Sequence, residues 1–184
     1  MLPNILTYVR ILIVPLISFF IYKEFKTADS SWGLYSAVIF ILAAITDFFD
    51  GYFARKMKMK SSVGKILDPL ADKLMVISIL IMLIPLERIS AVIVVIIMAR
   101  EFVITALRTL ASVAGIIIPA DKFGKIKTLF QMISIPILLI NYDLGFIHFY
   151  NLGKLLLLVS VFFSIFSAFL YVKRFFKVAK DLEF

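Results

Sequence analysis

Six long apolar stretches constrain this chain more than any other feature of its sequence. With a window of about 19 residues, they cover approximately 5–22, 34–54, 66–86, 89–112, 125–145 and 152–173. An α-helix needs about 20 apolar residues to cross the hydrocarbon core of a bilayer. We therefore expect an all-α polytopic membrane protein with six transmembrane helices, in which residues 1–184 form a single integral membrane domain.

The composition excludes an ordinary soluble domain. Hydrophobic residues make up 62% of the chain and charged residues 17%, whereas soluble domains contain roughly 45–50% and 25%. A chain of 184 residues has too little interior to bury so many apolar side chains. Because the chain has no cysteine, it is neither a disulfide scaffold nor a thiolate metal protein.

The distribution of basic residues predicts the orientation. Of the 20 lysines and arginines, 13 lie in or beside the second and fourth connections and the C-terminal tail, and only 4 lie in or beside the alternate connections. Loops rich in Lys and Arg stay in the cytoplasm, so we expect both termini to be cytoplasmic. The net charge of +8 is then explained by contact with anionic membrane lipids, and we expect no nucleic-acid partner.

Four aspartates stand where apolar spans should not contain them: Asp47, Asp50, Asp68 and Asp72. An ionised Asp at the centre of a membrane helix costs about 2.5–3.5 kcal/mol even on the lenient insertion scale. Asp47 and Asp50 are i and i+3, and Asp68 and Asp72 are i and i+4, so each pair shares one helix face. The short basic segment between the pairs predicts antiparallel neighbouring helices, with all four carboxylates at similar depth.

Two divalent cations would neutralise the charge of these four carboxylates. Ligation by oxygen alone favours Mg²⁺, Mn²⁺ or Ca²⁺ over zinc, and a pair of metals is suited to displacement at phosphorus. A structural alternative makes Asp68 a helix cap before Pro69 and pairs another Asp with Lys65 or Lys73. A second alternative is a cation or proton transporter, which would spread carboxylates across the membrane depth.

Residues 47–72 follow the pattern D-x2-D-G-x2-A-R-x8-G-x3-D-x3-D. This pattern resembles the signature of the CDP-alcohol phosphatidyltransferase family. The resemblance implies a membrane enzyme, usually a homodimer, that transfers a phosphatidyl group from CDP-diacylglycerol to an alcohol and releases CMP. It also implies an active site that opens to the cytoplasm, here at a bacterial inner membrane.

The resemblance further implies the roles of individual residues. Asp47, Asp50, Asp68 and Asp72 would bind two Mg²⁺ or Mn²⁺ ions, and Asp72 would also act as the general base. The remaining positions would bind CDP-diacylglycerol: Gly51, Ala54, Arg55, Ser61 and Gly64 in and near the signature, and Asn4, Thr7 and Arg10 near the N-terminus.

A second group of basic residues predicts a pocket for a phosphorylated acceptor. Arg100 and Arg108 are i and i+8 on one helix, about 40° apart, so they follow one stripe. Lys125 and Lys127 flank the start of the next span on the same side. Buried arginine suits phosphate because its donors are bidentate and always charged. Alternatively, Arg100 pairs with Glu101 or an Asp, and the two lysines only set the topology.

The segments A-R-E-F-V-I-T-A-L-R (99–108), F-G-K-I-K-T (123–128) and P-N-I-L-T-Y-V-R (3–10) resemble the phosphatidylglycerophosphate synthase branch of the family. That resemblance implies sn-glycerol 3-phosphate as the acceptor, with its phosphate held by Arg100, Arg108, Lys125 and Lys127. Another acceptor, inositol phosphate or serine, remains open, although serine would leave the two arginines with little to bind.

Overall fold

The computed structural model describes residues 2–56, 62–115, 118–119, 121–140 and 149–180; at 2–8, 47–56, 62–69 and 179 this covers the backbone alone. In that part of the chain the secondary structure is entirely helical, as expected. The six helices are α1 (Leu2–Thr27), α2 (Ser31–Lys56), α3 (Ser62–Met82), α4 (Ala91–Val113), α5 (Lys122–Ile140) and α6 (Phe149–Lys180).

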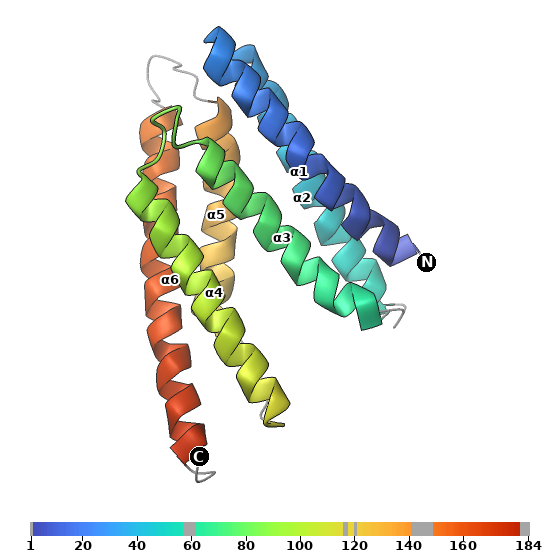
Figure 1. Cartoon of the computed structure of the whole chain (residues 1–184), viewed down its shortest axis with the longest axis vertical. Helices are drawn as coiled ribbons and strands as arrows, with labels where there is room; N and C mark the ends of the chain where they lie inside the picture. Colours follow the sequence, from blue (N-terminus) through green and yellow to red (C-terminus); the bar gives the residue numbers. More distant parts are fainter. Residues whose placement is uncertain (1, 57–61, 116–117, 120, 141–148, 181–184) are drawn as a thin grey trace.

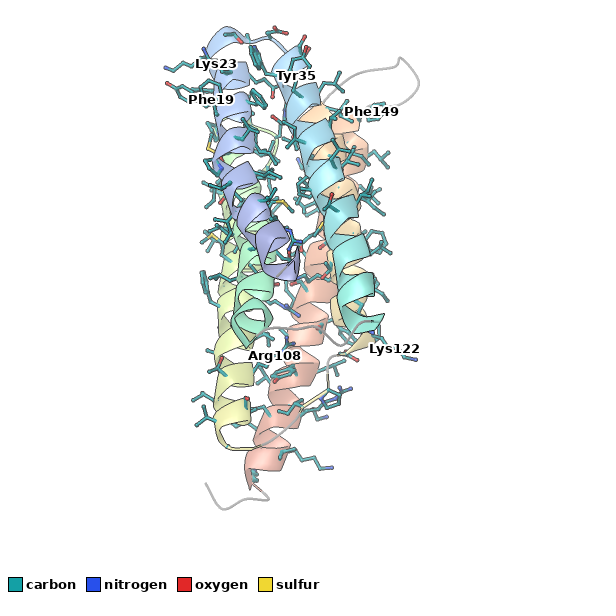
Figure 2. All side chains as sticks on the ribbon, turned by 90° about the vertical axis from the view of Figure 1, so that its right-hand side faces the viewer. Phe19, Lys23, Tyr35, Arg108, Lys122 and Phe149 are labelled. Carbon is teal, nitrogen blue, oxygen red and sulfur yellow. The ribbon has the colours of Figure 1, made fainter. Side chains whose placement is uncertain are left out.

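Successive helices run in opposite directions (Figure 1). The C-terminal ends of α2, α4 and α6 therefore lie at one end of the bundle, which we call the basic end (Figure 1). They adjoin the three regions in which the sequence concentrates its Lys and Arg residues. Figure 2 shows Arg108 and Lys122 toward this end, and Lys23, Tyr35 and Phe149 toward the other.

The helices pack into a continuous core. α1 packs against α2 and α3, α5 packs against α2, α3 and α6, and α4 packs against α3 and α6. α2 and α3 are antiparallel, as expected, but in the described residues each contacts α1 rather than the other. The most deeply buried large side chains include Ile17, Phe40, Ile79, Ile97, Leu138 and Leu157, which come from all six helices.

Contact between α5 and α6 depends on a glycine. A Cβ added at Gly153 would lie 2.8 Å from Cγ of Leu138, closer than real Cβ atoms approach another carbon. Small residues allow this approach in membrane helices, where packing rather than hydrophobic burial holds helices together. The Ser160 hydroxyl adds a hydrogen bond of 3.0 Å to the backbone oxygen of Lys127 across the same interface.

The outer surface of the bundle is apolar. Phe162 and Phe169 on α6 and Val92 and Val95 on α4 are more than 60% exposed. α5 and residues 149–178 of α6 are long and apolar enough to cross a membrane. In α4 the apolar sequence is interrupted by Arg100, Glu101 and Arg108.

A buried ion pair lies at the end of the bundle opposite the basic end. Arg88, in the connection between α3 and α4, pairs with Glu24 at the end of α1. Its Nη1 also donates to the backbone oxygens of Leu138 at 3.0 Å and Leu139 at 2.9 Å. These carbonyls belong to the last turn of α5, where the helix offers no backbone partners. Arg88 thus joins α1 and the α3–α4 connection to the C-terminus of α5.

Several helix ends differ from the ends of the expected spans. α3 ends at Met82 rather than near residue 86. Pro85 explains this, because a proline disfavours helical backbone at the residue before it and cannot donate a backbone hydrogen bond. α6 continues to Lys180, beyond the apolar stretch that ends near 173.

At the start of α2, the Ser31 backbone N–H donates to Asp29 and lowers the pKa of that exposed carboxyl.

Candidate active site

A cavity of about 990 Å³ lies among α2 to α6. One wall is apolar and comes from α2, with Phe40, Ile41, Ala44 and Ile45. The charged residues come from the other helices and the segment before α5: Asp72, Lys73, Arg100, Glu101, Arg108, Asp121, Lys125 and Lys127. Such a site can bind a ligand that is both apolar and anionic.

Asp72, which the sequence predicts to be the general base, lines this cavity near the middle of α3. Its Oδ1 lies 2.5 Å from Nη1 of Arg10 on α1. Arg10 is only 5% exposed, so the close packing of α1 against α3 holds its guanidinium in place. The ion pair thus fixes the position of the Asp72 carboxylate beside the cavity.

Glu101 organises two of the four basic residues assigned to the acceptor. Its Oε1 forms ion pairs with Lys127 and with Nη1 of Arg100, the latter at 2.9 Å. The other nitrogens of Arg100 donate to the Ser164 carbonyl at 3.2 Å and the Ser167 hydroxyl at 3.0 Å. Arg100 and Lys127 therefore have protein partners that connect α4 to α5 and α6, in line with the structural alternative for Arg100.

Arg108 and Lys125 differ from that pair. Both are exposed and line the cavity, and neither forms an ion pair with a carboxylate in the described part of the chain. The guanidinium of Arg108 lies over the ring of Tyr171, 5.9 Å from its centroid. Of the four basic residues assigned to the acceptor, these two therefore have no carboxylate partner in the described part of the chain that would compete with an anionic ligand.

The cavity contains residues that the sequence analysis gave no role in binding. From the sequence, Lys73 is predicted only as a possible ion-pair partner for an Asp. In the structure its Nζ donates to the Thr105 hydroxyl. Asp121 and Tyr171 line the same cavity. A smaller cavity of about 200 Å³, lined by Asp72, Lys73, Glu101, Lys127 and Gln131, lies beside it. The only sequence signal for Asp121 is that it is an acidic residue within a basic connection. No sequence signal distinguishes Tyr171, because α6 is rich in aromatic residues throughout.

The other predicted residues lie outside the described side chains. The structure gives helical backbone for Asn4 and Thr7 in α1, for Asp47, Asp50, Gly51, Ala54 and Arg55 in α2, and for Gly64 and Asp68 in α3, while Ser61 lies outside the described residues. The ends of α2 and α3 that carry the aspartates lie at the same end of the bundle (Figure 1). Among the side chains that are described, no three carboxylates or histidines are grouped as a metal site would require.

Comparison with known proteins identifies the family. The family model of the CDP-alcohol phosphatidyltransferases matches residues 1–166. The chain belongs to the CDP-alcohol phosphatidyltransferase family. It is therefore a phosphatidyltransferase, and the cavity that holds Asp72, Arg108 and Lys125 is the candidate active site of a family member.

Individual members of the family match over nearly the whole chain. The chain is 35% identical over 173 residues to a protein of Rickettsia felis, covering 94% of this chain and 93% of that one. It is 36% identical over 187 residues to a protein of Bacillus subtilis, covering 94% of both. Both relatives are named CDP-diacylglycerol–glycerol-3-phosphate 3-phosphatidyltransferase. A chloroplastic and mitochondrial protein of Arabidopsis thaliana with the same activity in its name is 38% identical over 192 residues, covering 96% of this chain and 63% of that one.

Proposed function

We propose that this protein transfers the phosphatidyl group from CDP-diacylglycerol to sn-glycerol 3-phosphate, giving phosphatidylglycerol phosphate and CMP. The observation that carries the proposal is the composition of one cavity. Asp72 can accept a proton there, and Arg108 and Lys125 line the same cavity without carboxylate partners in the described residues. The names of the relatives agree with this reaction.

The chemistry follows from these side chains. Asp72 accepts the proton of the acceptor hydroxyl, whose oxygen attacks the phosphorus that bears diacylglycerol. The new P–O bond forms as the bond to CMP breaks, and CMP leaves with its phosphate. Arg10 orients the Asp72 carboxylate through their ion pair. Arg108 and Lys125 hold the phosphate of the acceptor, while Glu101 keeps Arg100 and Lys127 in place beside them.

Two divalent ions, Mg²⁺ or Mn²⁺, are proposed to bind to Asp47, Asp50, Asp68 and Asp72. The donor chemistry fits, because carboxylate oxygens are the ligands that these ions prefer. The helical backbone at both pairs supports the one-face spacing of i, i+3 and i, i+4. When bound, the ions would supply charge neutralisation for the diphosphate and the leaving CMP.

The donor is proposed to bind at the ends of α1 to α3 near these aspartates. Gly51 and Gly64 have no side chain and Ala54 has only a methyl group, so a bulky nucleotide can approach the backbone there. Arg55 would contact the diphosphate, and Arg10 is already placed beside Asp72. Asn4, Thr7 and Ser61 complete the proposed donor site. The apolar wall from α2 would face the acyl-bearing part of the substrate.

We place the protein in a bacterial inner membrane as a homodimer with six transmembrane helices. The alternation of the helices and the exposed apolar surface support this arrangement (Figure 1). The active site and both termini would then face the cytoplasm, because the basic end carries most of the Lys and Arg residues. Membrane lipids would surround the bundle, and the dimer rests on the family resemblance.

The proposal is tested by measuring CMP release from purified protein with CDP-diacylglycerol and Mg²⁺. Glycerol 3-phosphate, inositol 1-phosphate and serine are offered separately. We expect release with glycerol 3-phosphate alone, and loss of that release when the metal is chelated. Release with a different acceptor would overturn the acceptor assignment. No release with any acceptor, in lipid in which a Bacillus subtilis relative is active, would overturn the proposed reaction.

A further inference from the structure

Two buried polar atoms in residues that line the candidate active site have no hydrogen-bond partner in the described structure. They are the hydroxyl oxygen of Tyr171 and Oδ2 of Asp121. Both residues line the large cavity, and Tyr171 is only 4% exposed. Buried polar groups in native proteins are nearly always hydrogen-bonded, so each such group needs a partner that explains it.

The two residues belong to one part of the cavity. Arg174, one turn beyond Tyr171 on α6, has its Nη2 3.8 Å from Oδ1 of Asp121. Asp121, which precedes α5, therefore lies beside the turn of α6 that carries Tyr171. The guanidinium of Arg108 over the Tyr171 ring places the proposed phosphate subsite next to the same turn.

The chemistry of the two atoms indicates what they bind. A carboxylate oxygen only accepts hydrogen bonds, and its charge repels a phosphate, so the partner of Asp121 must be a donor. A phenol hydroxyl donates and accepts. An alcohol hydroxyl matches both atoms chemically, because it can donate to a carboxylate such as that of Asp121 and accept from a phenol such as that of Tyr171.

The proposed acceptor has one such group to spare. Of the three polar groups of sn-glycerol 3-phosphate, the phosphate is assigned to Arg108 and Lys125, and the reacting hydroxyl to Asp72. The middle hydroxyl has no counterpart among these residues. We infer that Tyr171 and Asp121 form the subsite for this non-reacting hydroxyl and determine the specificity for it. This inference rests on the proposed function.

The test compares two acceptors on variants that remove one hydrogen-bonding function each. Tyr171→Phe keeps the ring under Arg108, and Asp121→Asn keeps an amide oxygen that can accept from the Lys122 backbone N–H, as Asp121 does at 3.0 Å. The acceptors are sn-glycerol 3-phosphate and 3-hydroxypropyl phosphate, which lacks only the middle hydroxyl. Tyr150→Phe and Asp29→Asn, in segments at the opposite end of the bundle, are the matched controls.

We expect kcat/KM for sn-glycerol 3-phosphate to fall roughly tenfold in each variant, as the loss of one substrate hydrogen bond predicts. The same constant for 3-hydroxypropyl phosphate should stay within about twofold of the wild type, since that acceptor has no hydroxyl to lose. The controls should match the wild type with both acceptors. The Tm of Tyr171→Phe should not fall, because the hydroxyl it removes has no hydrogen-bond partner among the described residues.

Other outcomes separate this inference from the proposed function. An equal loss with both acceptors would overturn the inference and assign the residues to the phosphate or to the shape of the cavity. Unchanged kinetics with both acceptors, in variants of an active enzyme, would also overturn it. A wild-type protein that uses neither acceptor but accepts serine would overturn the proposed acceptor, and the inference with it.

Discussion

Nη1 of Arg10 lies 2.5 Å from Oδ1 of Asp72, although 62 residues separate them in the chain. The pair joins the first helix, proposed to bind the lipid donor, to the residue proposed to activate the acceptor. Arg10 is buried, whereas Asp72 lines the cavity. The buried guanidinium therefore fixes the orientation of the carboxylate at the cavity wall. The position of the proposed donor-binding residues relative to Asp72 therefore depends on how α1 packs against α3.

Asp72→Asn should abolish transfer. The amide can still accept a hydrogen bond from Arg10, but it cannot take a proton from the acceptor hydroxyl. General-base catalysis contributes about 10²- to 10⁴-fold, so CMP release should fall by at least about a hundredfold. Binding of CDP-diacylglycerol, measured directly, should stay mostly intact. Near-normal turnover would show that Asp72 is not the base.

Arg10→Ala should lower kcat by roughly tenfold or more, because the Asp72 carboxylate loses the charge that orients it. Arg10→Lys keeps the charge without the planar fork of donors, so it should recover part of the activity. Steady-state kinetics with both substrates measure the effect, with the exposed Lys154→Ala as the control. If Arg10→Ala retains the wild-type kcat, the ion pair has no role in turnover.

Arg108→Ala and Arg100→Ala should have different consequences. Arg108 has no carboxylate partner in the described part of the chain, so its loss should raise KM for glycerol 3-phosphate at least about tenfold, with little change for the lipid donor or in Tm. Arg100 holds Glu101, Ser164 and Ser167. Its loss should therefore lower the Tm.

Both variants are compared with the wild type by steady-state kinetics and by thermal unfolding in the same detergent. Equal increases in KM for the two substrates in Arg108→Ala would remove Arg108 from the acceptor site.

Glu101→Gln should destabilise the bundle by about 3–5 kcal/mol, because it leaves the buried Lys127 and the half-buried Arg100 without a compensating carboxylate. The double variant Glu101→Gln with Lys127→Met removes one of those cations and should recover part of the loss. The free energy of unfolding in detergent measures both effects, and their difference gives the coupling between the residues. Additive losses would mean that the two side chains do not stabilise each other.

Removal of divalent metal should eliminate CMP release, and Mg²⁺ or Mn²⁺ should restore it. Added Mg²⁺ should also raise the Tm of the wild-type protein, since a ligand that binds the folded state stabilises it. Asp47→Asn and Asp50→Asn should show a smaller increase in Tm at the same Mg²⁺ concentration. An equal increase in these variants would place the metal elsewhere.

Much of this architecture could be predicted from the sequence. Six apolar stretches predict six helices, and helical spacing puts Asp47 with Asp50 and Asp68 with Asp72 because neighbours on a helix face are set by a local repeat. The same reasoning placed Arg100 and Arg108 on one stripe, and both line the cavity. The 26-residue signature, at 47–72, also identified the family.

The side-chain pairs that connect different helices could not be predicted in this way. Helical periodicity says which side chains share a face, but the tilt and depth of packing decide which face of another helix they meet. Sequence alone therefore could not assign Arg10 to Asp72, or show that Glu101 holds Lys127 as well as Arg100.

The sequence by itself determined the helices, their alternation and the chemistry that the chain can perform, since all three depend on local composition and spacing. Only the tertiary structure decided which cations are free to meet the acceptor. Arg100 and Lys127 both pair with Glu101, whereas Arg108 and Lys125 line the cavity without a described carboxylate partner. That division exists because helices distant in sequence bring their charges together only when the bundle has packed.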